Sequence, residues 1–273
     1  MTIKEINGSI EEGAALKNIA AAYTEISSLK LKRIREQVLR TRAFFVEVLN
    51  IYAMLKHIVL KKTLIEPPKG KKVSIILTSN NRFYGHIESE LLRFFLSQRS
   101  DKGDILVVGT GGREAFGSLH LPFQSVIFKD DVPAAQELTN LVNMIKAYGT
   151  VLVYFARFKS VLTQVPAAVD ITQSQAQAAK TPERTEESFI FEPEAPKILD
   201  FFDSQLKQTL IEQTFLETEL ARTSSRLIFM DQAQNNADEF LKQQQRLLSS
   251  ARMSLQNTQI LETITSMIKE RHL

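Results

Sequence analysis

A glycine-rich turn is the feature of this sequence whose residue types come closest to a ligand site. Gly109, Gly111 and Gly112 follow an apolar run, an order that resembles the phosphate-binding turn of dinucleotide enzymes. The spacing departs from G-x-G-x-x-G at Glu114, whose carboxylate would repel a pyrophosphate at a helix start. A P-loop lysine is absent as well. We expect a structural turn and no cofactor, with nucleotide binding as the less favoured alternative.

Metal and nucleophilic chemistry find little support in the residue types. The sequence contains no cysteine, which excludes a disulfide framework, a thiolate nucleophile and a cysteine metal site. No two histidines lie four residues apart, a spacing that places two metal ligands on one face of a helix. The four histidines are His57, His86, His120 and His272. We expect neither a metal site nor catalytic residues in this chain.

Basic side chains gather in the first part of the chain. They are Lys30, Lys32, Arg33, Arg35, Arg40 and Arg42, interrupted by Glu36. Two interpretations stay open: a solvated helix face, or a positive collar that faces an acidic, ring-shaped partner. Nucleic-acid binding ranks below both, because it favours interleaved aromatic residues and a basic domain, whereas 34 basic side chains here face 31 acidic ones.

The positions of proline and glycine indicate how the chain is organised around these residues. All eight prolines lie between Pro67 and Pro196, and no glycine follows Gly149. Residues 197–273 therefore contain neither helix breaker and can form one very long helix. Residues 1–66 contain no proline and only two glycines, so they can form a second long helix.

The C-terminal segment repeats its pattern every seven residues, which is typical of a coiled coil. One track consists of Leu220, Leu227, Gln234, Leu241, Leu248, Leu255 and Glu262. The second track is small or polar and consists of Thr223, Met230, Ala237, Gln244, Ala251, Thr258 and Thr265. In the N-terminal segment we expect a comparable stripe, shifted in phase near Gly13, of Ile3, Ile10, Ile19, Ala22, Ile26 and Leu29. Since a whole domain separates the two segments, they are predicted to pack as an antiparallel coiled coil.

Between the two helices the sequence has the rhythm of a compact α/β domain. We expect strands at Lys72–Thr78, Asp104–Gly109, Val126–Phe128, Thr150–Phe158 and Val161–Val169. We expect helices at Ile87–Gln98, near Arg113 and at Pro133–Tyr148, and a polar loop over residues 170–188. This alternation predicts a mostly parallel, Rossmann-like sheet whose final strand pair is antiparallel. The chain is thus divided into an N-terminal long helix (1–66), this domain (67–190) and a C-terminal long helix (191–273).

Short motifs occur in order along the predicted elements. They are Ile3-Lys4-Glu5-Ile6 with Ile10, Ile19, Ala22, Ile26 and Lys30-Leu31; Thr78-Ser79 with Gly85; Gly109-Thr110-Gly111-Gly112 with Phe116; and Phe191-Glu192-Pro193-Glu194 with Leu199-Asp200. The pattern R-x-x-x-M-x-x-A-x-x-N-A is matched by Arg226, Met230, Ala233, Asn236 and Ala237, and Arg252 follows. Together these motifs resemble the gamma family of rotary F-type ATP synthases. The chain departs from the family pattern at Tyr23, Asn80, Arg222, Met253, Asn257 and Gln259. Arg222 stands where the family has an acidic residue, so the resemblance is to a divergent member.

The resemblance implies a central-stalk rotor without catalytic residues of its own. Its coiled coil would turn inside a hexamer of alpha and beta subunits and couple ion flow through a membrane ring to ATP synthesis or hydrolysis. The implied partners are that hexamer, a small epsilon-type subunit and the membrane c-ring. With no run of 18 apolar residues, we expect peripheral attachment at the cytoplasmic face of the cell membrane, or at an organelle inner membrane.

The resemblance also assigns contact residues by position. Contacts to the catalytic subunits are expected at Tyr23, Arg226, Arg252, Met253 and Asn257. For the two arginines, pairing within or between the chain's own helices is the alternative. The collar would consist of Lys30, Lys32, Arg33 and Arg35, and contacts to the membrane ring or the epsilon-type subunit are expected at Arg82, Phe83 and Tyr84.

Three other functions stay open at this point. The chain could be the rotor of a divergent ATP-hydrolysing motor that is not coupled to ion transport, or a static coiled-coil scaffold. It could also be a Rossmann-fold enzyme with helical arms, although neither a cofactor cradle nor a convergent acid/base set is visible.

Overall fold

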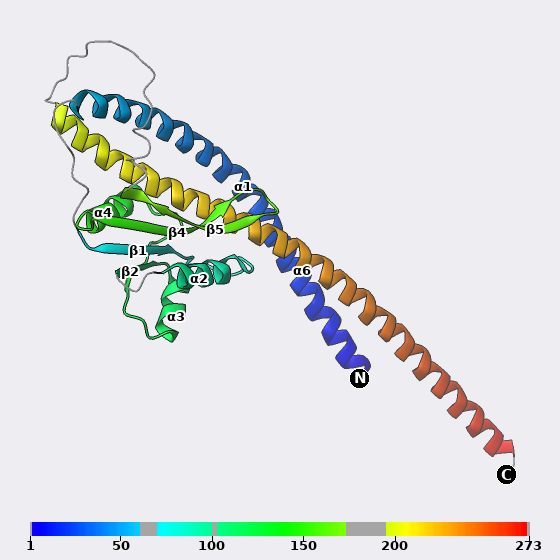
Figure 1. Ribbon diagram of the computed structural model, residues 1–273. Coiled ribbons are helices and arrows are strands. Elements are labelled where there is room, and N and C mark those ends of the chain that lie inside the picture. The colour runs from blue at the N-terminus through cyan, green and yellow to red at the C-terminus, as the bar shows by residue number, and fades with distance from the viewer. Residues whose placement is uncertain (1, 61–69, 100–102, 173–194, 272–273) are drawn as a thin grey trace. The chain divides into compact units, whose positions relative to one another are not determined.

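The computed structural model describes residues 2–60, 70–99, 103–172 and 195–271 (Figure 1). Two very long helices dominate it, as the sequence predicted: α1 (Ile3–Leu60) and α6 (Ala195–Arg271). The chain divides by its contacts into two compact units. The coiled-coil unit comprises Met1–Ser27 with Leu227–Leu273, and the sheet unit comprises Ser28–Arg226. None of the described helices combines the length and the apolar character that crossing a membrane requires.

The sheet unit contains a five-stranded sheet in the order β3-β2-β1-β4-β5. Its strands are β1 (Lys72–Leu77), β2 (Asp104–Val108), β3 (Gln124–Val126), β4 (Thr150–Phe158) and β5 (Gln164–Asp170). β1 pairs in parallel with both β2 and β4, β2 pairs in parallel with β3, and β4 and β5 are antiparallel. The Rossmann-like sheet and its antiparallel final pair are therefore confirmed.

β1 and β2 each end one residue before the predicted boundary, and larger differences occur at two other strands. β3 begins two residues before the predicted Val126, and β5 begins at Gln164 rather than Val161. The second difference has a local cause: Ser160 and Lys159 both donate their N–H groups to the carbonyl of Thr163, so this stretch forms a tight turn. The polar loop predicted over 170–188 lies outside the described residues from position 173 onward.

Helices cover both faces of the sheet, and the core has two layers. α2 (Ile87–Gln98) and α3 (Thr110–Ser118) pack Leu91, Phe95 and Phe116 against one face. α4 (Ala135–Ile145) packs four apolar residues against the other face, where α6 adds Ile211 and Phe215.

α6 is itself enclosed within the sheet unit. α1 packs onto it from outside through Ile34 and Val38, which meet Leu216 and Leu220. Every residue of α6 from 214 to 226 is buried, including all its polar ones. A helix that is buried on every side must satisfy its polar side chains inside the protein, which fixes where the polar contacts of this unit occur.

Within the coiled-coil unit, α1 and α6 run antiparallel. Lys17 pairs with Asp238 at 2.6 Å, and Gly13 lies against Phe240 and Leu241, so the α6 residue number falls as the α1 number rises. Apart from Ile228 and Asp238, the less exposed α6 positions from residue 227 onward are Leu227, Met230, Gln234, Ala237, Leu241, Gln244, Leu248 and Ala251. These are the predicted heptad positions, and the register is confirmed up to residue 251. The remaining predicted positions, from 255 to 265, are exposed.

The predicted N-terminal stripe is wrong beyond Gly13. Its large members are exposed, with Ile19 at 54% and Ile26 at 55%, and Leu29 is 68% exposed. The track that is buried in α1 has an unbroken seven-residue spacing and consists of Ile6, Gly13, Ala20, Ser27 and Ile34. Its small residues allow close approach, since a Cβ at Gly13 would lie 3.0 Å from the ring of Phe240. Large aliphatic side chains therefore do not mark the contact face of this helix beyond Gly13.

Candidate functional site

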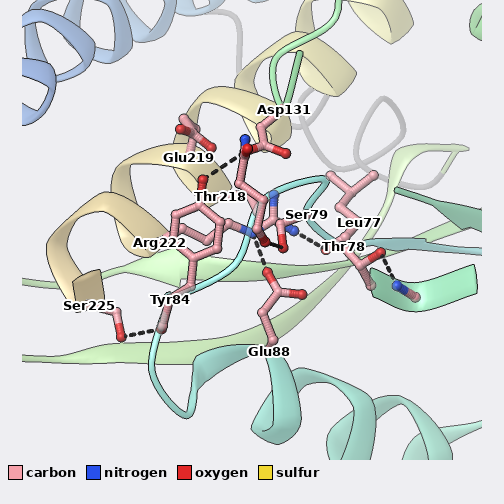
Figure 2. Close-up of polar contacts among 12 residues, drawn as sticks. Leu77, Thr78, Ser79, Tyr84, Glu88, Asp131, Thr218, Glu219, Arg222 and Ser225 are labelled. Atoms are coloured by element: carbon pink, nitrogen blue, oxygen red, sulfur yellow. Dashed lines mark hydrogen bonds and ion pairs between the residues drawn. The ribbon is translucent and has the colours of Figure 1, made fainter. Parts of the chain in front are cut away.

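A buried polar cluster lies where β1 ends, inside the sheet unit (Figure 2). The strand order reverses beside β1, because β2 and β3 lie on one side of it and β4 on the other. In doubly wound α/β folds, ligands bind at the carboxyl ends of the strands next to such a reversal. This cluster therefore occupies the position where the fold class would place a ligand.

Arg222 of α6 is the centre of the cluster. Its side chain is 2% exposed; Nη2 donates to the carbonyl of Leu77 at 2.6 Å, and Nε lies 2.5 Å from a carboxylate oxygen of Glu88. Burial alone lowers the pKa of Arg222, but the carboxylates of Glu88, Glu219 and Asp131 outweigh it and raise the pKa, so the guanidinium stays charged. A helix N-terminus favours an anion, and the carboxylate of Glu88, in the first turn of α2, is the anion found there.

Two further α6 residues on the same helix face hold the loop that follows β1. Ser225 donates from Oγ to the carbonyl of Tyr84 at 2.8 Å, and Arg226 donates from Nη2 to the carbonyl of Arg82 at 2.9 Å. The guanidinium of Arg226 also lies over the ring of Tyr84, 3.9 Å from its centroid. Positions 222, 225 and 226 have the i, i+3, i+4 spacing that places side chains on one face of a helix.

Asp131 holds the same loop from the other side. Its two carboxylate oxygens accept hydrogen bonds from the N–H of Asn80 at 2.6 Å, the amide of Asn81 at 2.8 Å and the hydroxyl of Tyr84 at 2.7 Å. Burial alone would raise the pKa of Asp131, but these donors outweigh it and lower the pKa, so the carboxylate is ionised. Burial in turn raises the pKa of Tyr84, so its hydroxyl keeps its proton.

Two acidic residues of α6 face α1. Glu219, whose side chain is 1% exposed, forms an ion pair with Lys30, and Glu217 lies 2.6 Å from Arg42. Burial raises the pKa of Glu219, while Lys30 and Arg222 lower it. Lys30, predicted as part of an exposed collar, is thus engaged inside the chain, whereas Lys32, Arg33 and Arg35 are exposed.

The glycine-rich turn is used for packing. At the start of α3 the Thr110 N–H donates to Asn80 Oδ1, the Gly111 N–H to the Ser79 carbonyl, and the Gly112 N–H to Thr78 Oγ1. These are the amides that a phosphate would otherwise use.

Close approach explains two of the glycines in this turn. Gly109 has a φ of 99°, and a Cβ on Gly112 would lie 2.4 Å from Thr78 Oγ1. Glu114 points to solvent, 3.7 Å from exposed Arg82. The predicted structural turn is thus what the structure shows, although the reason is occupied amides and close packing rather than the charge of Glu114. Among the described residues no group of three or more histidines, aspartates and glutamates is arranged to hold a metal.

The predicted contact residues are divided between surface and interior. Arg82 and Phe83 are exposed, the latter at 60% with a φ of 68°. Tyr84 is 2% exposed, so its prediction as a surface contact is wrong: its hydroxyl is needed by Asp131 inside the unit. Arg226 is 7% exposed and donates to the carbonyl of Arg82 in the chain's own loop, a contact that neither interpretation of this residue predicted.

The other predicted contacts lie on the coiled-coil unit. Tyr23 is half-buried, and Arg252, Met253 and Asn257 are exposed, Met253 at 64%.

The end of α6 is a helix whose every described side chain is exposed, from residue 252 to residue 268. Its exposed apolar side chains are Met253, Leu255, Ile260, Leu261, Ile264, Met267 and Ile268, each between 48% and 64% exposed. Ile260, Ile264 and Met267 share one face. A helical segment of this length is marginal in water by itself, and so much apolar surface marks a site of interaction with another chain.

Sequence reasoning missed the buried cluster. Arg222 stood out only as a departure from a motif, and neither Glu88 nor Asp131 carried a signal. One signal was available: Thr218, Thr223, Ser224 and Ser225 give this part of α6 small polar side chains on successive faces, which is typical of a helix packed closely on all sides.

Two long antiparallel helices flank a Rossmann-like domain in the sequence, and Arg222 of the second helix binds at the carboxyl end of β1. Together these features define a helical stalk protein. A family model described as ATP synthase matches residues 2–267. The chain belongs to the gamma family of ATP synthase subunits.

Similar proteins cover nearly the same length. The ATP synthase gamma chains of Methylococcus capsulatus and Ruthia magnifica are each 22% identical to this chain, over 96% of it and 96% and 97% of their own lengths. Among solved structures, the rotor of the Euglena gracilis mitochondrial ATP synthase has a TM-score of 0.63 at 14% identity, covering 92% of this chain and 99% of that one. The structure of the central stalk and c-ring of the Tetrahymena thermophila mitochondrial ATP synthase contains a chain with a TM-score of 0.60 at 20% identity. The match covers 79% of this chain and 99% of that one.

Proposed function

We propose that this chain is the central-stalk rotor of an F-type ATP synthase, coupling ion flow through a membrane ring to conformational change in a hexamer of alpha and beta subunits. The observation that carries the proposal is the end of α6, where every described side chain from residue 252 to residue 268 is exposed and the apolar ones among them form a surface that calls for a partner. A ring of subunits is such a partner. Family membership supports this function over the static scaffold and over a motor without ion transport.

The rotor would act by differential contact. A single helix presents different side chains to each subunit of a ring, so each angular position stabilises a different conformation of the nearest catalytic site. Arg252, Met253 and Asn257 are exposed at the base of this helix end and are proposed contacts. Arg226 is proposed to act indirectly, by fixing the loop that presents Arg82 and Phe83.

The remaining assignments follow from the rotor function. The chain contributes no catalytic residues, and ATP chemistry belongs to the hexamer. Its sheet unit is proposed to contact the membrane c-ring and a small epsilon-type subunit, with Arg82 and Phe83 as candidates, while Lys32, Arg33 and Arg35 face acidic segments of the catalytic subunits. The complex would be attached to a membrane, with this chain at its cytoplasmic face or at the equivalent face of an organelle inner membrane.

Site-specific photo-crosslinking in the assembled complex tests the proposal. A benzophenone side chain at Ile264, on the exposed helix end, should capture nucleotide-binding subunits, identified by mass spectrometry. The matched position is Leu119, 45% exposed on the sheet unit, which should capture a different set of chains. The proposal fails if Ile264 captures no nucleotide-binding subunit, or if both positions capture the same partners.

A further inference from the structure

The buried cluster joins a helix to a domain through main-chain contacts. Arg222, Ser225 and Arg226 donate to the carbonyls of Leu77, Tyr84 and Arg82, so one face of α6 holds both ends of the segment that follows β1. A main-chain carbonyl cannot change rotamer as a side chain can. The acceptors are therefore fixed, and a shift of α6 along or around its axis must strain the donor side chains, break these bonds or move the segment.

The segment is equally fixed to the rest of the domain. Three groups of the segment donate hydrogen bonds to the carboxylate of Asp131. The side chain of Asn80 accepts a hydrogen bond from the first amide of α3, and the hydroxyl of Thr78 donates to the carbonyl of Val108 in β2. A displacement of α6 is therefore passed directly to β1, β2 and α3. Elsewhere in the unit α6 contacts the sheet through apolar side chains such as Ile211 and Phe215, which resist sliding less than directed bonds do.

The buried charges around Arg222 compensate one another but contribute little to the stability of the fold. Arg222 introduces a buried positive charge, and Glu88, Glu219 and Asp131 surround it. Such groups add little net stability compared with apolar packing, although the removal of one partner is strongly destabilising because it leaves an uncompensated buried charge. A buried ionic cluster with fixed geometry is thus poorly explained by stability alone, and a mechanical role accounts for it.

We propose that Arg222, held by Glu88 and the Leu77 carbonyl, is the positioning residue that locks α6 to the sheet unit, so that torque passes between the helix and the domain without slip. This inference rests on the proposed rotor function, since a lock against rotation has a use only where the helix turns under load. Ser225 and Arg226 extend the lock by one helical turn, and Glu219 ties it to α1 through Lys30.

The first experiment measures the lock in the isolated full-length chain. Because the sequence lacks cysteine, Phe201→Cys on α6 and Leu119→Cys on the domain, both exposed, provide a unique pair for spin labels. Glu88→Gln removes the charge that holds Arg222 but keeps the side-chain shape. We expect the distribution of label distances to broaden about twofold, as local opening becomes accessible. The matched control is Glu114→Gln, which loses only an exposed pair with Arg82 and should leave the distribution unchanged.

A second variant guards against a general loss of folding. Ser225→Ala removes one hydrogen bond to the Tyr84 carbonyl without leaving a buried charge, and it should broaden the distribution in the same direction but less. Equal distributions for Glu88→Gln and Glu114→Gln would overturn the lock, whatever the function of the chain.

The second experiment uses the assembled complex, with a bead attached through the thiol that Leu119→Cys introduces. In the Glu88→Gln variant, ATP hydrolysis without load should be unchanged, whereas rotation against viscous load should slow and angular fluctuations should widen. If the parent rotates the bead and the variant has the same stiffness, the lock is refuted. If no form rotates the bead while the spin labels still report loosening, the lock stands and the proposed rotor function fails.

Discussion

Replacement of Gly112 by alanine tests the interpretation of the glycine-rich turn as a packing device. The added Cβ would lie 2.4 Å from Thr78 Oγ1 and 2.6 Å from a methyl carbon of Val107, a core residue with no exposed surface. Thr78 can relieve this contact only by rotating, which breaks the bond that it accepts from Gly112 and the bond that it donates to Val108. Each of these bonds contributes about 1 kcal/mol and overpacking adds about 1 to 3 kcal/mol, so the expected loss is about 3 to 5 kcal/mol.

The matched control lies in the same helix. A Cβ on Gly117 meets nothing within 4 Å, so Gly117→Ala should gain up to about 0.5 kcal/mol from helix propensity. Urea denaturation followed by tyrosine fluorescence is suitable, because the chain has no tryptophan and Tyr84, Tyr148 and Tyr154 all lie in the sheet unit. Gly112→Ala should also lower the melting temperature by more than about 6 °C. If Gly112→Ala and Gly117→Ala unfold alike, the packing argument is refuted.

Three further predictions follow from the same contacts. Isothermal calorimetry with ATP or NAD should detect no micromolar binding to the isolated chain, because Arg222 occupies the carboxyl end of β1 and the amides of α3 are taken; measurable heat would show an open site. Ala237→Leu and Ala251→Leu should each destabilise the coiled-coil unit by about 1 to 3 kcal/mol by overpacking its seam, whereas Gln245→Leu, at an exposed position, should not; equal melting curves would contradict the register. Asp131 has a lowered pKa, so its contribution to stability is complete above the ordinary aspartate range and is lost as the pH falls through the lowered value; Asp131→Asn should flatten this acid-side loss in denaturation curves.

An element could be predicted from the sequence where its residues left few alternative structures. α6 and β4 were predictable because the absence of helix breakers and a run of apolar residues leave few alternatives. The register of α6 was predictable from leucines at heptad spacing, whereas that of α1 was not, because its contact track consists largely of small residues such as Gly13 and Ala20. Small residues can be recognised as the close-contact face of a helix only once the partner helix is known.

The buried cluster was beyond prediction for a related reason. Charged residues are almost never fully buried unless they are paired, so Arg222 alone gave no reason to expect burial. Its partners Glu88 and Asp131 lie far from it in sequence, and only the fold brings them together. Tyr84 was assigned to a contact surface by position, from the family resemblance, yet its hydroxyl points inward to Asp131.

The central claim, that the end of α6 turns within a ring of catalytic subunits, is tested most directly by a reversible tether. Met267→Cys, at a position 61% exposed on the helix end, would be the only cysteine of this chain and can form a disulfide with a cysteine introduced on a facing catalytic loop. A second tether guards against unwinding of the helix end. Gln234 lies on the seam with α1, so exposed Lys242 is the better position for it.

In each tethered complex the measured quantity is steady-state ATP hydrolysis before oxidation, after oxidation and after reduction. The rotor account predicts near-normal activity in the reduced form, suppression of multisite turnover once the disulfide has closed, and recovery when it is reduced again, with nucleotide binding intact throughout. Full activity with both tethers verified as closed would contradict the account, because a static scaffold tolerates a tether and a rotor does not.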